Sequence, residues 1–138
     1  MTWYIFIGIL VVLFFGYKLA TFKPRKAAHT VATSLGIKRQ FVDNMLTAMG
    51  PERGHLFVQS IASWGDADNH GAYTFVVYQI MKNDSDDNIR WWKSKLRENN
   101  IDPIMDRSKA EVAFTFLRDA GADRDQIDNF IKVYNSIS

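Results

Sequence analysis

The chain of 138 residues is 47% apolar and 23% charged, which suffices for one domain with a packed core and argues against a disordered chain. It contains no cysteine, so disulfides, thiolate metal sites and a cysteine nucleophile are excluded. The net charge of +2 is unevenly distributed: the first 26 residues carry four basic and no acidic side chains, and the others carry 13 basic and 15 acidic ones. The chain after residue 26 therefore lacks the basic excess that is typical of tight nucleic-acid binders.

The N-terminus has the length and hydropathy of a membrane-spanning helix. Residues 2–22 hold one charged side chain, Lys18, and would extend about 31 Å as a helix, close to the roughly 30 Å of a bilayer core. A cleaved signal peptide would need a basic segment before the apolar run and a small-residue cleavage site after it, and the sequence offers neither. We therefore predict a retained transmembrane anchor over residues 1–22 and a separate domain over residues 23–138.

Four basic side chains lie at or beyond the C-terminal end of the apolar run: Lys18, Lys23, Arg25 and Lys26. By the positive-inside rule, this flank places the following domain in the cytoplasm and the N-terminus outside. Binding of anionic lipid headgroups by the same side chains is the alternative, and a topology signal alone is favoured. Gly16 and Ala20 form a single small-xxx-small pair, which leaves homo-oligomerisation through the anchor open.

Beyond the anchor, helix signals recur and no clean alternation of apolar and polar residues predicts a strand. Helices are predicted, in chain order, over residues 25–35, 37–49, 52–64, 72–82, 88–99, 109–120 and 126–137. Glycines follow four of them: Gly36, Gly50, Gly65 and Gly121. Glycine readily adopts the left-handed conformation that ends many helices, and Pro51 suits the first position of the next helix. The predicted fold class is all-α, with an N-terminal transmembrane helix followed by a small cytoplasmic multi-helix domain.

The stretch VATSLGIKRQFVDNM, residues 31–45, has the spacing of small and apolar residues of a helix-turn-helix. In this interpretation residues 38–48 form a recognition helix, and four side chains face the major groove of DNA: Lys38, Arg39, Gln40 and Asn44. Upstream, however, only the anchor precedes the motif, and the rest of the chain is slightly acidic, which disfavours phosphate binding. The alternative is two helices that meet at a glycine turn and bury four apolar side chains: Leu35, Ile37, Val42 and Met45.

Side chains able to cap helix N-termini precede the later helices: Asp66, Asp68 and Asn69, then Ser85 or Asp86, then Asp106 or Ser108. Asp123 and Gln126 form a capping-box-like pair before the last helix. Residues 72–82 are apolar all round, which predicts a central buried helix, although residues 74–80 would also suit a buried strand. Helical spacing predicts the core of the last two helices: Val112, Ala113, Phe116, Leu117, Ile127, Phe130, Ile131 and Tyr134.

Patterns that would indicate catalysis or metal binding are weak. Residues 66–71, DADNHG, open like a calcium-binding loop, but Val77 stands where that loop needs a glutamate. Residues 83–88, NDSDDN, are better interpreted as a solvated helix start, where carboxylates interact favourably with the helix dipole. The three histidines are scattered singly, and no nucleophile elbow or phosphate-binding glycine loop is present. The sequence therefore predicts no enzymatic activity, no cofactor and no bound metal.

One set of residues, mostly in the C-terminal third, carries a family resemblance: Trp92, Pro103, Ile104, Asp106, Phe116, Leu117, Arg118, Ile127, Phe130, Tyr134 and Asn135, together with Met45, Met49 and Gly50. With the N-terminal anchor, they resemble an uncharacterised bacterial family of small single-pass inner-membrane proteins, a domain of unknown function. Residues 51–90 match that family loosely. The resemblance implies an inner-membrane location and supplies no activity, ligand or catalytic residue.

These observations lead to two functional expectations. The favoured one is a membrane-tethered helical interaction or scaffold protein of the bacterial inner membrane, which binds the lipid bilayer through its anchor and acts through a protein partner. The alternative is a membrane-bound helix-turn-helix regulator that binds DNA, and nucleic acid is the less favoured partner.

Overall fold

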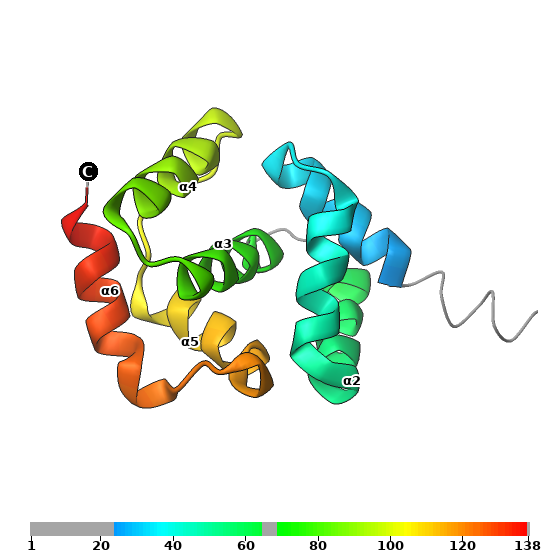
Figure 1. Ribbon diagram of the computed structural model, residues 1–138. Helices are drawn as coiled ribbons and strands as arrows, with labels where there is room; N and C mark the ends of the chain where they lie inside the picture. Colours follow the sequence, from blue (N-terminus) through cyan, green and yellow to red (C-terminus); the bar gives the residue numbers. More distant parts are fainter. Residues whose placement is uncertain (1–23, 65–68, 138) are drawn as a thin grey trace, which may run out of the picture.

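The computed structural model describes residues 24–64 and 69–137, and all regular structure in these residues is helical (Figure 1). Residues 24–35 are helical, and the elements that follow are α2 (Arg39–Trp64), α3 (His70–Lys82), α4 (Asp86–Glu98), α5 (Arg107–Phe116), the 3-10 helices η1 (Arg118–Ala120) and η2 (Arg124–Gln126), and α6 (Ile127–Ser136). The predicted all-α class is therefore confirmed for the described residues. A strand over residues 74–80 is excluded because they lie inside α3, and the predicted domain boundary at residue 22 lies outside the described residues.

Three helical stretches end at residues with a left-handed backbone: Gly36 (φ 65°), Asn100 (φ 61°) and Gly121 (φ 107°). After each, the next N–H bonds to a carbonyl five residues back: Ile37 to Ala32 (3.0 Å), Ile101 to Leu96 (2.9 Å) and Ala122 to Leu117 (3.1 Å). This pairing closes the last helical turn and brings an apolar residue back onto it. The predicted ends at the two glycines are confirmed, and the helix predicted to end at residue 99 ends within one residue of it. The left-handed conformation of Asn100 was not predicted from the sequence, and Gly65 lies outside the described residues.

Gly50 divides α2 into two arms, residues 39–49 and 51–64. Its backbone angles, φ 82° and ψ 170°, belong to a region that is essentially restricted to glycine. Pro51 follows, and its missing N–H is harmless at the first position of the second arm. The predicted break at Gly50 and Pro51 is therefore confirmed, and both predicted helices appear as arms of α2.

Two predicted N-caps are confirmed. Ser85 Oγ accepts from Asn88 N at 3.3 Å, and Asp106 Oδ1 accepts from Lys109 N at 2.8 Å. Asn69 occupies the N-cap position of α3, but its backbone is left-handed and its side chain makes no capping hydrogen bond.

The predicted capping box before α6 is wrong. The side chain of Asp123 accepts from Asp125 N (3.0 Å), whereas Gln126 N bonds to the backbone carbonyl of Asp123 (2.9 Å). This bonding forms the 3-10 turn η2, so that α6 begins at Ile127. The predicted helix over residues 109–120 also tightens near its end, where α5 passes into η1 before the turn at Gly121.

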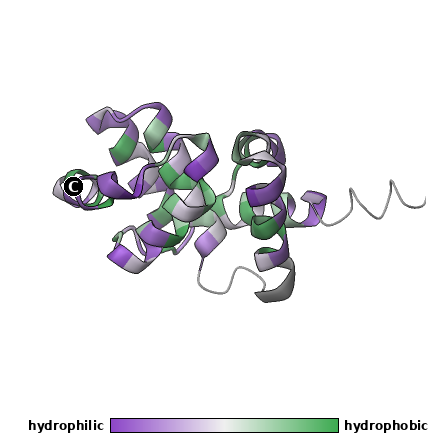
Figure 2. Ribbon diagram, turned by 90° about the horizontal axis from the view of Figure 1, so that it is seen from below, coloured by the Kyte–Doolittle hydropathy of each residue, from purple (hydrophilic) through white to green (hydrophobic). Residues whose placement is uncertain are grey.

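The central helix of the molecule is α3. Its residues from Gly71 to Val77 are all buried, because α3 packs most extensively against α5 and also contacts α2 and α4. The burial predicted for residues 72–82 is therefore confirmed for the first half of the helix, whereas Tyr78, Gln79 and Met81 are half-buried and Lys82 is exposed. Figure 1 shows α3 between α2 on one side and α4 and α6 on the other. In Figure 2 the hydrophobic parts of the helices face one another and the hydrophilic parts face outward. Of the predicted core residues of the last two helices, four are buried and four are half-buried: Ala113, Leu117, Ile127 and Tyr134, then Val112, Phe116, Phe130 and Ile131.

The irregular connection between α4 and α5, residues 101–106, is held by side chains from α3 and α6. Three successive bonds reach its backbone carbonyls: Tyr73 Oη to Asp102 O (2.7 Å), Tyr134 Oη to Pro103 O (2.6 Å) and Asn135 Nδ2 to Met105 O (3.1 Å). Asn135 Oδ1 also accepts from Met105 N at 3.4 Å. A segment without helical hydrogen bonds is thus satisfied by distant side chains, which fix α6 relative to α3.

The prediction of a single-pass inner-membrane protein requires correction. Within residues 24–64 and 69–137, no helix combines the length and the apolar character needed to cross a bilayer. α2 is long enough at 26 residues but contains charged side chains and the break at Gly50, whereas α3 is apolar but has 13 residues, or about 20 Å. The predicted anchor over residues 1–22 lies outside the described residues. We therefore withdraw the predicted inner-membrane location and orientation.

Candidate functional site

The basic flank predicted from the sequence falls only partly within the described residues. Lys18 and Lys23 lie outside them. Arg25 and Lys26 are exposed on the helical stretch 24–35, and neither contributes to the core. The structure therefore places two of the four flank residues at the surface and leaves their role untested.

The predicted helix-turn-helix stretch folds as two helices joined at Gly36. The four side chains predicted to contact DNA are exposed at the start of α2: Lys38, Arg39, Gln40 and Asn44. Arg39 Nε lies 3.5 Å from Asp43 Oδ2, in an exposed ion pair. The apolar residues of the motif face inward: Leu35, Val42 and Met45 are buried and Ile37 is half-buried. This arrangement fits both a DNA-binding motif and a plain helical pair, so DNA contact stays a prediction.

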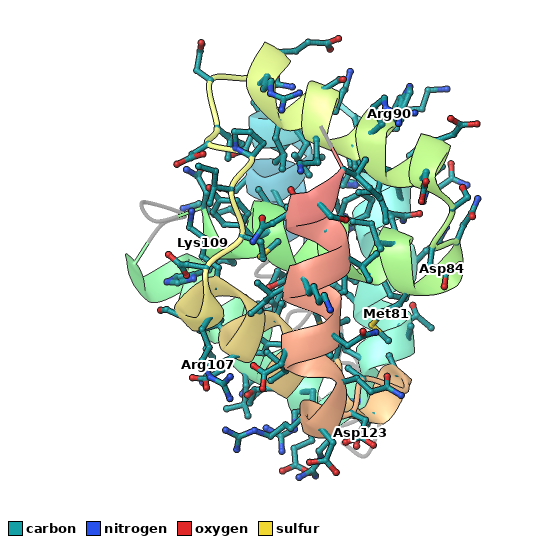
Figure 3. All side chains as sticks on the ribbon, turned by 90° about the vertical axis from the view of Figure 1, so that its left-hand side faces the viewer. Met81, Asp84, Arg90, Arg107, Lys109 and Asp123 are labelled. Carbon is teal, nitrogen blue, oxygen red and sulfur yellow. The ribbon has the colours of Figure 1, made fainter. Side chains whose placement is uncertain are left out.

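A groove of about 380 Å³ runs beside α6, and we call it the α6 groove. Its walls are formed by the end of α3, the α3–α4 turn, the start of α4, α5, the segment after η1, the end of η2, and α6. The lining residues are Ile80, Met81, Asp84, Ile89, Phe114, Gly121, Ala122, Gln126, Asn129, Phe130, Val133 and Tyr134. Figure 3 shows Met81 and Asp84 together on one side of α6, and Asp123 beyond its lower end. The volume is in the range of pockets that hold ligand groups.

The floor of the α6 groove is apolar and closely packed. Ile89, Phe114 and Tyr134 are buried there. The ring of Phe130 packs edge-to-face on Phe114, with centroids 5.5 Å apart, and stacks on Tyr134 at 5.8 Å. Such ring pairs contribute about 0.5–1.5 kcal/mol beyond area burial, so the floor is preformed.

The mouth of the α6 groove is open and amphipathic. Val133 is 38% exposed, and Met81 is half-buried. A Cβ atom added to Gly121 would meet nothing within 4 Å, which shows that this wall is open. Gln126 and Asn129 are exposed and present side-chain amides beside the apolar surface.

A buried lysine supports the groove from behind. Lys93 is 5% exposed, and its Nζ donates to Tyr134 O at 2.8 Å and to Ile137 O, and lies 4.7 Å from the centre of the Tyr134 ring. These carbonyls end α6, where a cation is favoured by the helix dipole. Desolvation lowers the pKa of Lys93, with a further contribution from Arg97, and burial raises the pKa of Tyr134. Both side chains donate hydrogen bonds to backbone carbonyls and thereby hold α6 in place.

The α3–α4 turn holds Asp84 at the edge of the groove. Asn88 Nδ2 donates to Asn83 O at 2.7 Å and to Gln79 O at 3.4 Å, and Ser85 N donates to Asn83 Oδ1 at 3.2 Å. These bonds connect the end of α3 to the start of α4. The backbone that carries Asp84 is therefore held in place by hydrogen bonds within the chain.

Neither the burial of Lys93 nor the α6 groove was predicted from the sequence. The prediction of a helix start at residues 83–88 is confirmed, but Asp84 also lines the groove. A signal for Lys93 was available, because Ile89, Trp92 and Leu96 mark the buried face of α4 and Lys93 lies on it. The groove had no such signal, since its lining comes from several helices.

Comparisons with known proteins agree with this fold and name no activity. A family model described as "Protein of unknown function (DUF1198)" matches residues 1–138. The chain is 24% identical over 138 residues to "Uncharacterized protein YicN" of Escherichia coli K12, covering 99% of this chain and 92% of that protein, and the same figures hold for YicN of Escherichia coli O157:H7.

A crystal structure of a "Protein of Unknown Function YPO2564 from Yersinia pestis" is similar in fold. The TM-score is 0.76 at 28% identity, over 84% of this chain and 90% of that chain. These matches confirm the predicted resemblance to an uncharacterised bacterial family. They do not support the single-pass membrane character that was predicted with it.

Proposed function

The chain belongs to the DUF1198 family of uncharacterised proteins, and on this premise we propose that it is a helical interaction protein that binds a polypeptide partner in the α6 groove. One observation carries the proposal. The apolar floor of the groove reaches solvent at Val133 and Met81, directly beside the exposed side-chain amides of Gln126 and Asn129. A buried apolar centre with a polar rim is the usual anatomy of a protein–protein contact.

The fixed walls of the groove support this function. The bonds from Tyr134 to Pro103 O and from Lys93 to Tyr134 O hold α6 on the rest of the molecule. A preformed site loses less conformational entropy on binding than a mobile one. The groove is thus suited to receive one or two apolar side chains of a partner, which are the contacts that dominate many interfaces.

The chemistry of the lining favours binding over catalysis. Of the groove's lining residues, Asp84 and Tyr134 carry an ionisable side chain. The hydroxyl of Tyr134 donates to Pro103 O, and burial raises its pKa, so it is a poor general base at neutral pH. We therefore propose no enzymatic activity for this groove.

Site-specific photocrosslinking in the bacterial cell tests the proposal. A photoreactive phenylalanine analogue at Val133 should crosslink to a discrete polypeptide, because Val133 lies at the mouth of the groove. The same analogue at Gln59, an exposed residue of α2, is the matched control. Absence of an adduct at Val133, or the same adduct at Gln59, would contradict binding in the groove.

DNA binding, without the membrane attachment predicted for it, is the second candidate function. The observation that favours it is the exposure of Lys38, Arg39, Gln40 and Asn44 directly after the turn at Gly36. If these side chains read DNA, the full chain should bind one duplex sequence at physiological salt, and changing Lys38 and Arg39 to Ala should abolish that binding. Retention that disappears as salt rises, with no sequence preference, would dismiss this candidate.

A further inference from the structure

Both ends of the α6 groove are acidic. At one end, residues 82–87 carry three aspartates and one lysine, and at the other, residues 118–128 carry four aspartates and two arginines. Among the residues that line the groove, Asp84 carries the charged side chain. Figure 3 shows Asp84 beside α6 and Asp123 beyond its lower end.

Only part of this negative charge is neutralised by ion pairs among the described residues. Three aspartates have ion-pair partners: Asp87 with Arg90, Asp119 with Arg118, and Asp128 with Arg107. Four others have no cation at ion-pair distance in the part of the chain that the structure describes: Asp84, Asp86, Asp123 and Asp125. Three exposed cations lie nearby, Lys82, Arg124 and Lys132, so with four unpaired aspartates the balance at the groove stays slightly negative.

We infer that the α6 groove selects a basic amphipathic segment of its partner: an apolar side chain for the floor, flanked by lysine or arginine at one or both ends. The inference rests on the proposed function and adds the chemistry of the partner. The apolar floor supplies contact area, and the unpaired aspartates at the two ends supply charge complementarity, which sets the preference among partners. Segments flanked by acidic residues are rejected by repulsion at the same aspartates.

The bonding of the two acidic ends supports this selection. The turn that carries Asp84 is fixed by Asn88 and Asn83, and Asp123 is held by Asp125 N. Neither carboxylate needs to be reorganised before it meets a cation. Because both are exposed, each contact should change affinity modestly, by about two- to five-fold, and should weaken with salt.

Selection of random short peptides displayed on phage against the immobilised full chain tests the inference. The enriched peptides should combine an aromatic or aliphatic residue with an excess of lysine and arginine over the starting library. Val133→Asn, which removes apolar contact at the mouth without adding charge, should abolish the enrichment. The affinity of one enriched peptide, measured by fluorescence anisotropy, should fall several-fold between about 0.05 M and about 0.5 M NaCl.

A variant that removes two of the negative charges, which we call the charge variant, tests the contribution of the acidic ends to peptide affinity. Asp84→Asn combined with Asp125→Asn keeps the side-chain shapes and should weaken binding of that peptide roughly four- to twenty-five-fold, as the product of two exposed ion pairs. The control, Asp43→Asn with Glu52→Gln, removes the same charge from α2 and should leave the affinity unchanged.

The outcomes separate the two proposals. Peptides that need Val133 but show no basic excess, or that bind the charge variant as tightly as the original chain, would overturn the basic-partner inference and leave the groove as a binding site. No enrichment, or enrichment that Val133→Asn does not affect, would overturn both.

Discussion

The C-terminal and N-terminal regions of the molecule differ in the kind of contact that stabilises each of them internally. In the C-terminal region, residues 70–137, hydrogen bonds link side chains to backbone groups about 30 to 40 residues away, for example Tyr134 to Pro103 O and Lys93 to Tyr134 O. In the N-terminal region, residues 24–64, the side-chain hydrogen bonds between described residues reach back one turn of the same helix, as from Ser34 to Thr30 O and from Thr47 to Asp43 O.

The two regions contact each other through a side-chain hydrogen bond and through aromatic packing. Asn99 Nδ2 donates to Leu35 O at 3.0 Å, and the rings of Phe57 and Phe116 meet edge-to-face at 5.3 Å. Apolar packing tolerates small shifts, whereas directional bonds to carbonyls do not. The comparison indicates that the C-terminal region holds one precise geometry around the α6 groove, and that the N-terminal region is specified mainly by its apolar face.

The variant Tyr134→Ala should show the largest difference in stability between the two regions. Removing this buried ring should lower the free energy of unfolding by about 3–5 kcal/mol, because it leaves a cavity and an unsatisfied carbonyl at Pro103. Phe41→Ala in the N-terminal region is the control, since Phe41 is 50% exposed and should cost far less. Urea unfolding measures both, and equal losses would contradict the comparison.

Gly50→Ala should produce the next largest effect, within the N-terminal region. The residue has φ 82° and ψ 170°, and an alanine forced into that region should cost about 1–3 kcal/mol in backbone strain. No atom lies within 4 Å of the added Cβ, so a loss measured by urea unfolding would report strain and not a clash. A loss below about 0.5 kcal/mol, the range of ordinary surface substitutions, would show that the break in α2 relaxes.

Val42→Ala tests the apolar packing of the N-terminal region directly. Val42 is fully buried, and loss of two methyl groups should lower the free energy of unfolding by about 0.5–2 kcal/mol. Thermal unfolding followed by circular dichroism gives the value. A change within experimental error would mean that this face is not part of the core.

Alkaline pH should weaken the C-terminal region through Tyr134. Burial raises the pKa of its phenol above the ordinary 10.0, so the unfolded chain loses this proton at lower pH than the folded one. Stability is therefore retained below pH 10 and lost above it, by about 1 kcal/mol between about pH 10 and about pH 11. Lys93, with its lowered pKa, acts in the opposite direction up to its ordinary 10.5.

The variant Tyr134→Phe distinguishes the contribution of Tyr134 to the alkaline loss of stability from that of Lys93. Urea unfolding at each pH should show that the alkaline loss disappears in this variant, even though the variant is less stable at neutral pH because Pro103 O loses its donor. An identical alkaline loss in both proteins would assign the effect to other groups.

The smallest effect is expected from Lys38→Ala combined with Arg39→Ala. Both side chains are exposed, and the Arg39–Asp43 ion pair is solvated, so the free energy of unfolding should change by less than about 0.5 kcal/mol. Thermal unfolding is the measurement. A larger loss would show that these charges support the turn at Gly36 in a way that simple exposure does not predict.

Much of the helical framework was determined by local sequence. Gly36, Gly50 and Gly121 have the positive φ that ends or breaks a helix, and Ser85 and Asp106 cap the helices that they precede. Each of these effects involves neighbours within about five residues, which is why a linear pattern predicts it. The continuous apolar composition of α3 likewise predicted its central, buried position.

The site itself was decided by the tertiary structure. Lys93 is buried because the end of α6 offers it two carbonyls, and Tyr134 is fixed by Pro103 O across 31 residues. The α6 groove combines the ends of α3 and α5 with one side of α6, so no single segment encodes it. Aspartates that begin helices in the sequence lie at the rim of the α6 groove, because long-range packing, which local propensity does not contain, brings two acidic turns to the same apolar surface.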